Sequence, residues 1–321
     1  MSQPNDPHGK LFRALLDDPA LARGLLFDHL PAAVCAQLAP APEIALEDGS
    51  FVDAALRGSQ ADRVFSAKLK DGRRALIYTL LEHKATPDPG TPLQLLRYMV
   101  RIWEREAGGV ASKLRALPAI MPLVIYHGRA PWSVPTALSG VLDAPAAMGP
   151  WVPEFRYEVR DLGRMSDADL GRDARLRAGL GALKYAFQDG GLVMLGGLLA
   201  EVRDDPALLE LLAWYVLTAY HEDRDTVREV FVGAARTQGE EAVMNALQEA
   251  EARGEARGEA RGAARGKAEA VLSVLESRFG GVDARLRARI WAADTEALDA
   301  MLKRAVTAGH PEDVLDTSAP H

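Results

Sequence analysis

The chain has 321 residues, of which 48% are hydrophobic and 26% charged, and its 38 Lys and Arg against 45 Asp and Glu give a formal net charge of −7. There is enough apolar material for a core, so the composition excludes a wholly disordered chain. A single cysteine, Cys35, excludes an intramolecular disulfide framework and a cysteine-rich zinc or iron–sulfur site. The polar N-terminus has no targeting signal and no apolar run approaches the roughly 18 residues of a membrane span, so we expect a soluble, cytoplasmic protein with no membrane partner.

The first half of the chain predicts helices followed by a hairpin. Apolar residues recur at helical spacing over Lys10–Leu30, where Pro19 either breaks one helix or starts a second. Strands are expected over Asp62–Leu69, which alternates, and over Arg74–Lys84, which contains a nearly continuous apolar run. The dipeptide Asp71-Gly72 between them is a hairpin signal.

The following segments complete an α/β pattern. A helix is expected over Leu93–Glu106, a buried strand over Ala119–Tyr126 and a further strand over Phe155–Leu162. This order predicts an α/β fold with a mixed sheet flanked by helices, followed by an all-helical C-terminal extension. We therefore divide the chain into a sheet-containing core at 1–165, a helical region at 166–250, a repeat at 251–267 and a short helical tail at 268–321.

Residues 251–266 form the tandem repeat EARG-EARG-EARG-AARG. On an α-helix, a period of four places like charges one turn apart, and each glycine costs about 1 kcal/mol relative to alanine. The repeat therefore predicts a weak, solvated helix or a flexible linker. Because the glutamates nearly cancel the arginines, a linker or oligomer contact is favoured over a contact with nucleic-acid phosphates.

Basic residues gather in one part of this acidic chain. Ten Lys and Arg against five Asp and Glu lie between Arg57 and Arg105, a local balance of +5. A basic segment can hold phosphates even on an acidic chain, because charge interactions in salt are short-ranged. A solvated surface explains the segment equally well.

One group of residues could carry chemistry: Asp62 and the run Glu82-His83-Lys84. Two carboxylates supply the oxygen ligands that Mg²⁺ prefers. Lys84 lies two residues after Glu82 and hence on the same strand face, where it could assist an attacking water or stabilise charge on a phosphate. Spacing alone does not distinguish this arrangement from a surface ion pair between Glu82 and Lys84.

The hairpin register offers a test of the metal site. With a two-residue Asp71-Gly72 loop, paired residue numbers sum to 143, and Asp62 and Glu82 face opposite sides. With the three-residue loop 70–72, Asp62 lies opposite Leu80 and is a diagonal, same-face neighbour of Glu82. A loop over 71–73 places Asp62 directly opposite Glu82. A metal site thus predicts a three-residue loop or a bulge.

Several ordered motifs resemble those of one family. They are PHGKLFRALLDDPALARGLLFDHLP, SFVDAALRGSQADRVFSAKLKDGRRALIYTLLEHKATPD, LQLLRYMVRIWER and LPAIMPLVIYHG. They resemble the Rpn family of recombination-promoting nucleases, also described as putative transposases (YhgA-like). The resemblance covers residues 7–165 well and the helical remainder loosely.

The resemblance implies a restriction-endonuclease-like, PD-(D/E)XK core that acts on DNA with a divalent metal, expected to be Mg²⁺. The family's first acid falls on Asp62, and its E-x-[KQ] motif falls on Glu82 and Lys84. Gln94 and Arg97 could reach the site or the DNA backbone. A role for His127 in supporting the site is weighed against a plain strand-end turn.

One position departs from the family pattern: the usual His-Asp before the first helix is His8-Gly9 here. Loss of that acid could weaken activity, and Asp6 is a poor substitute. We therefore expect a metal-dependent DNA endonuclease that hydrolyses phosphodiester bonds with low sequence specificity and promotes recombination. The alternative is a catalytically weakened DNA-binding or interaction protein on the same fold. A homodimer, joined through the C-terminal helices, would let a single-site nuclease cut both strands.

Overall fold

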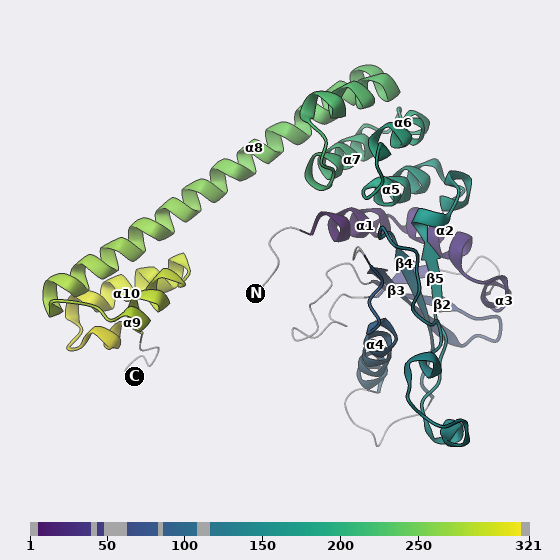
Figure 1. The fold of residues 1–321 in the computed structure, drawn as a ribbon, viewed down its shortest axis with the longest axis horizontal. Coiled ribbons are helices and arrows are strands. Elements are labelled where there is room, and N and C mark those ends of the chain that lie inside the picture. Colours follow the sequence, from purple (N-terminus) through teal and green to yellow (C-terminus); the bar gives the residue numbers. More distant parts are fainter. Residues whose placement is uncertain (1–5, 40–43, 48–62, 83–85, 108–115, 316–321) are drawn as a thin grey trace. The chain divides into compact units, whose positions relative to one another are not determined.

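The computed structural model describes residues 6–39, 44–47, 63–82, 86–107 and 116–315. The chain divides into two compact units, Met1–Ala246 and Leu247–His321 (Figure 1). The first unit contains a sheet with helices packed against it, and the second is helical.

A five-stranded sheet lies at the centre of the first unit. Its strands are β1 (Ile44–Leu46), β2 (Arg63–Lys68), β3 (Arg74–Glu82), β4 (Ala119–Tyr126) and β5 (Glu158–Asp161). Their order in the sheet follows the chain. The β1–β2 and β2–β3 pairs are antiparallel, whereas the β3–β4 and β4–β5 pairs are parallel. This mixed sheet with flanking helices confirms the predicted α/β class. The short β1 was not predicted.

The apolar run of β3 forms a strand that is buried on both faces. Its even-numbered residues Leu76, Tyr78 and Leu80 pack with α4 (Thr91–Glu106), and Figure 1 shows that helix beside the sheet. The odd-numbered residues Ile77, Thr79 and Leu81 face the other side of the sheet and are buried too. A guanidinium nitrogen of Arg74 lies 2.8 Å from a carboxylate oxygen of Glu106, so the end of α4 meets the start of β3. The first turns of α4 therefore lie toward the end of β3.

The β2–β3 hairpin has a three-residue loop. Paired residues such as Arg63 and Thr79 have numbers that sum to 142, and the Leu69 N–H donates to the Arg73 carbonyl at 2.8 Å. Residues 70–72 close the loop, and Gly72 has φ +85°, a left-handed conformation that favours glycine. This is one of the registers that the metal-site hypothesis required.

A capping signal separates the first two helices of the chain. α1 (Pro7–Asp17) is followed at once by α2 (Pro19–His29), and the carboxylate of Asp18 accepts hydrogen bonds from the Ala20 and Leu21 N–H groups at the start of α2. A proline at the first helical position after an aspartate cap is a strong start signal. A short helix, α3 (Ala32–Cys35), follows.

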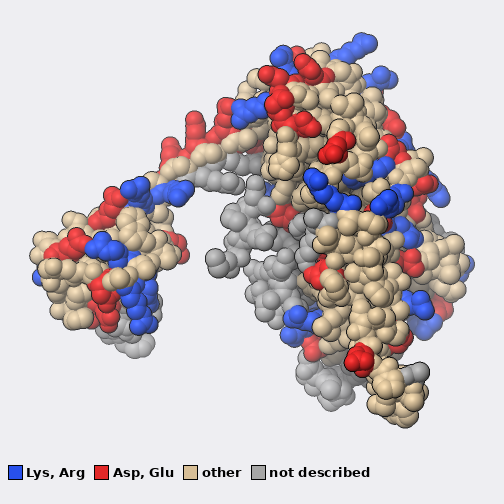
Figure 2. Space-filling model, viewed as in Figure 1, with Lys and Arg blue, Asp and Glu red and all other residues tan. Residues whose placement is uncertain are grey.

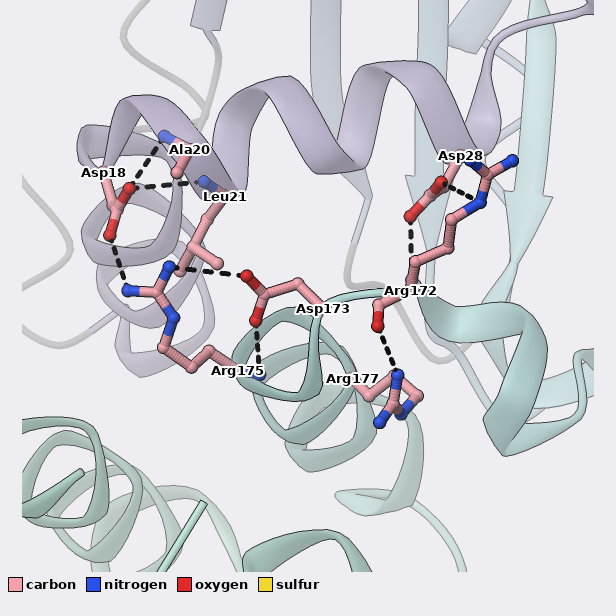
Figure 3. A network of polar contacts seen from close by, with 8 residues as sticks. All are labelled: Asp18, Ala20, Leu21, Asp28, Arg172, Asp173, Arg175 and Arg177. Atoms are coloured by element: carbon pink, nitrogen blue, oxygen red, sulfur yellow. Dashed lines mark hydrogen bonds and ion pairs between the residues drawn. The ribbon is translucent and has the colours of Figure 1, made fainter. Parts of the chain in front are cut away.

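Ion pairs join these N-terminal helices to α5 (Ala174–Tyr185), more than a hundred residues later in the chain (Figure 3). Asp18 lies 3.0 Å from a guanidinium nitrogen of Arg175, and Asp28 accepts a hydrogen bond from the Arg172 N–H at 2.8 Å. Burial alone would raise the pKa of Asp18, but the N–H groups that cap α2 and the charge of Arg175 lower it. These contacts thus join the start of α5 and the residues just before it to the N-terminal helices.

The remaining elements are helical. They comprise the 3₁₀ helices Leu138–Val141, Ala146–Trp151, Leu162–Arg164, Asp167–Leu170 and Pro311–Leu315, together with α6 (Gly191–Glu201), α7 (Pro206–Ala219), α8 (Arg224–Phe279), α9 (Ala284–Trp291) and α10 (Thr295–Thr307). α8 contains the repeat and has a kink at Arg236, where φ is +52°. In the second unit, Val271, Leu275, Ile290 and Leu298 belong to one core. No helix in the described ranges has the length and apolar character that a membrane span requires.

Candidate active site

Glu82 is the last residue of β3, and its side chain is only 5% exposed. It shares the face of β3 that carries Tyr78 and Leu80, and this face packs against α4. Because β3, β4 and β5 are parallel, their carboxyl ends lie at one edge of the sheet, where α/β proteins commonly place binding sites. A buried carboxylate at this edge is the central feature of the candidate site.

A row of polar side chains runs along that edge from Glu82. In the strand register, Glu82 pairs with Tyr126 of β4, which in turn pairs with Asp161 of β5. Burial raises the pKa of the Tyr126 hydroxyl, and the charges of Asp161 and Glu82 raise it further. The row therefore places a phenol where both carboxylates act on it electrostatically.

Hydrogen bonds hold the loop after β4 to this row. The Tyr126 hydroxyl donates to the Ala130 carbonyl at 2.7 Å, and Asp161 accepts from the Trp132 N–H at 3.0 Å. The sequence did not lead us to expect Tyr126 and Asp161 in the candidate site. The signal that could have indicated them is their position: Tyr126 is the last residue of β4 and Asp161 the last residue of β5, and both strands run parallel to β3.

The helix that covers this face carries two of the predicted residues. Gln94 is half-buried and Arg97 is exposed, and both lie in the first half of α4. This half of α4 lies toward the end of β3, because the other end of the helix meets Arg74. Gln94 and Arg97 are thus on the same face of the sheet as Glu82. Tyr98 belongs to the core and packs 5.1 Å from the Tyr78 ring.

His127 lies at the same edge but points to the opposite face. Its backbone N–H donates to the Glu82 carbonyl at 3.4 Å, whereas its ring lies near α5, with Nδ1 3.2 Å from the Leu183 carbonyl oxygen. The ring also stacks on Phe187, with centroids 5.5 Å apart. His127 therefore joins the edge of the sheet to α5.

The start of α1 also reaches this edge. The His8 ring lies 4.9 Å from the His127 ring, and His8 Nδ1 is 2.8 Å from the Tyr215 hydroxyl of α7. Asp6 caps α1 by accepting from the Gly9 N–H at 2.8 Å. The N-terminal motif, which differs from the family pattern at Gly9, thus begins beside the end of β4. Asp6 has a structural role of its own, as the cap of α1.

Two of the three predicted catalytic residues, Asp62 and Lys84, lie outside the described residues. Glu82 is described, and the hairpin register is one that the metal site required. The roles of Asp62, Glu82 and Lys84 remain predictions.

Ion pairs neutralise much of the basic segment between Arg57 and Arg105. Arg63 pairs with Asp17, Arg73 with Asp71, Arg74 with Glu47 and Glu106, and Arg101 with Glu104. Figure 2 shows basic and acidic side chains interspersed on the face in view. Among its described basic residues, those left without an ion pair are Lys68, Lys70 and Arg97. The positive charge available to a phosphate backbone is smaller than the composition suggested.

The donor chemistry of the predicted ligands suits a hard divalent cation. Carboxylate oxygens are the side-chain ligands that Mg²⁺ takes, usually one or two together with water and substrate phosphate. Within the described ranges, no group of three or more His, Cys, Asp or Glu side chains could hold a metal ion. Of the predicted ligand pair Asp62 and Glu82, the structure describes Glu82.

Comparisons with known proteins agree with the resemblance seen in the motifs. The family model described as "Putative transposase, YhgA-like" matches residues 6–208. The chain is 34% identical over 131 residues to the recombination-promoting nuclease RpnD of Escherichia coli O157:H7, covering 40% of this chain and 49% of that protein. It is 34% identical over 126 residues to RpnA of E. coli K12, covering 39% and 41%.

A further relative bears on activity. The chain is 28% identical over 127 residues to the "inactive recombination-promoting nuclease-like protein" RpnE of E. coli K12, covering 40% of this chain and 41% of that protein. Each match thus spans less than half of the relative's length. No solved structure is significantly similar to the chain. Because the family model matches more than half of its residues, the chain belongs to the family described as "Putative transposase, YhgA-like".

Proposed function

We propose that this protein is a metal-dependent DNA endonuclease that hydrolyses phosphodiester bonds during recombination, with its active site at the carboxyl edge of the sheet. The observation that carries the proposal is Glu82, a buried carboxylate that ends a central strand, in a hairpin whose register fits a second acid on the same face. The similarity to recombination-promoting nucleases supports the same chemistry.

Each residue of the site has a distinct role in this proposal. Asp62 and Glu82 would hold Mg²⁺, which when bound would stabilise negative charge on the phosphate. Lys84 would either orient the attacking water or, as the neutral amine, accept its proton; alternatively, its charged form would stabilise the phosphate. The buried position of Glu82 keeps its carboxylate fixed and partly shielded from water, which strengthens its interaction with a cation.

Binding to DNA would depend on a few unpaired cations. Arg97 on α4 lies on the same face of the sheet as Glu82, so it is placed to contact a phosphate of the bound strand. Contacts to the phosphate backbone carry no sequence information directly, so we expect low sequence specificity.

The test is nicking of a supercoiled plasmid by the purified full chain, with Mg²⁺ or with EDTA. We expect nicking in Mg²⁺ only, and expect Asp62→Ala, Glu82→Gln and Lys84→Ala to reduce it to the EDTA level. Glu104→Gln and Lys303→Ala are matched controls, because Glu104 is exposed on α4 and Lys303 is exposed on α10 of the second unit, and both variants should retain nicking. Nicking that survives the three site substitutions would refute the proposed site.

A second candidate is a DNA-binding protein that has lost cleavage. Gly9 in place of the family's usual acid favours it, as does the similarity to a relative named as inactive. This candidate predicts salt-sensitive binding of plasmid DNA with no nicking in Mg²⁺. Binding measured by gel shift beside the nicking assay separates the two candidates.

A further inference from the structure

The second unit contains a cavity of about 360 Å³ that the proposed nuclease site does not use. It lies between the repeat segment of α8 and the turn that joins α9 to α10. Arg261 and Arg265 of the repeat line one side, and Trp291 at the end of α9 lines another. The rest of the lining is Leu298 and three alanines, and these small side chains leave the space open.

The charge of this cavity is entirely positive. Its lining contains two arginines and no acidic residue, although the repeat as a whole is nearly neutral. Arg265 Nε donates to Glu269 at 2.9 Å, which leaves its two terminal amino groups available, and Arg261 has no hydrogen bond or ion pair with any described residue. The two guanidinium groups lie one helical turn apart, where they repel each other, so an anion between them would be favourable.

Another cavity of the same unit lacks this excess of positive charge. That cavity, of about 500 Å³, is lined by Arg285 and Arg289 together with Glu312 and Asp313, so its charges balance. The acidic side chains of this second cavity would oppose the binding of an anion there. The arginines of the repeat therefore differ in surroundings from those of α9.

Trp291 adds a flat aromatic surface to the same cavity. The side chain is 45% exposed, although indole is among the most favourable groups to bury. A planar ring beside two guanidinium groups fits a ligand that combines an aromatic ring with a phosphate. An acidic peptide would satisfy the arginines but leave the indole uncovered. A duplex would hide its bases within the stack.

We propose that this cavity binds a nucleotide of single-stranded nucleic acid, with its base stacked on Trp291 and its phosphates held by Arg261 and Arg265. The site is separate from the sheet and does not require cleavage there. A linker or oligomer contact, which the composition of the repeat favoured, gives no reason for the indole to line the same cavity as the two arginines.

The experiment measures binding of a short fluorescein-labelled oligothymidylate to the full chain by fluorescence anisotropy, in EDTA so that cleavage does not intervene. We expect Trp291→Ala and Arg261→Gln each to weaken binding at least about fivefold, and Trp291→Phe to retain most of it. Arg287→Gln is the matched control, because it removes the same charge from α9 at an arginine that pairs with Glu276 outside the cavity.

A crosslink locates the site directly. An oligothymidylate that carries one 5-iodouracil should crosslink to Trp291, as mapped by mass spectrometry. Circular dichroism checks that the variants are as helical as the wild-type chain. The proposal is overturned by equal affinity across the variants, by an equal loss in Arg287→Gln, by a crosslink confined to other residues, by effective competition from a polyglutamate peptide, or by no binding of the wild-type chain.

Discussion

Gly9 lies in the first turn of α1, whose start contacts the end of β4 through the His8 and His127 rings. The edge at which β4 ends also carries Glu82. A carboxylate at position 9 would lie at the same edge of the sheet as the proposed site, and the helix N-terminus would stabilise its charge. Position 9 therefore lies nearer to this edge of the sheet than its distance along the chain suggests.

We predict that Gly9→Asp raises Mg²⁺-dependent nicking about tenfold or more, because the loss of an outer carboxylate at a metal site typically costs about 10- to 100-fold. Gly9→Ala, which adds a side chain without a charge, should leave the rate unchanged. Initial rates on supercoiled plasmid measure the effect, with the thermal midpoint of each variant recorded beside it. Equal rates for the aspartate and alanine variants would show that this position does not limit activity.

His29 links α2 to the chain before α5. The side chain is buried, and its Nε2 donates to the Leu170 carbonyl at 3.1 Å. Burial lowers the pKa of His29 below its usual value of about 6.5, the charge of Arg160 lowers it further, and the hydrogen bond to Leu170 and the charge of Asp28 only partly oppose this. His29 is therefore neutral in the folded protein at neutral pH.

This lowered pKa predicts a stability that depends on pH. The unfolded chain binds the proton first as the pH falls, so the contribution of His29 is complete above about pH 6.5 and is lost as the pH falls toward its folded pKa. Urea unfolding at several pH values between 5 and 8 should show the wild-type chain losing stability below pH 6.5 faster than His29→Gln, by at most about 1.4 kcal/mol per pH unit. Parallel curves for the two proteins would contradict the assignment.

At the scale of the elements, Gly72 determines the β2–β3 register. Its φ of +85° lies in the left-handed region, and a Cβ added there would meet no atom within 4 Å. The cost of Gly72→Ala is therefore the backbone conformation alone, about 1 kcal/mol. In a unit of this size, that cost lowers the thermal midpoint by about 2–4 °C.

A helical glycine of the repeat serves as the comparison. Gly262 lies in α8, and a Cβ added there also meets no atom within 4 Å. Gly262→Ala should therefore raise helix stability, by up to about 1 kcal/mol. Circular dichroism melts of both variants would check the opposite signs. A Gly72→Ala variant as stable as the wild-type chain would mean that the loop tolerates another conformation.

Local signals predicted most of the elements of the sheet. The apolar run of β3 and the span Ala119–Tyr126 of β4 were recognisable because both strands are buried, and Asp18-Pro19 marked the start of α2. β1 was missed because a three-residue strand contains too little pattern. The register was left open among three loops, since only the backbone of Gly72 decides between them.

The candidate site was predictable only in part. Glu82 was identified because an acid closes an apolar strand, which is a local pattern. The Tyr126–Asp161 pairing depends on strand order, and the contact of His8 with Tyr215 joins residues 207 positions apart. Such contacts arise from tertiary packing, so no local pattern in the sequence could indicate them.

At the scale of the whole molecule, two separate cores predict two unfolding transitions. Leu25 is fully buried in the first unit, and Leu275 is fully buried in the core of the second. Replacing either by alanine leaves a cavity and costs about 2–5 kcal/mol. In calorimetry of the full chain, Leu275→Ala should lower the midpoint temperature of one transition, and Leu25→Ala should lower that of the other. The shift should be larger in the smaller second unit, because a given free energy displaces the midpoint of a smaller unit further. A single transition that both variants lower equally would show that the cores unfold as one cooperative unit.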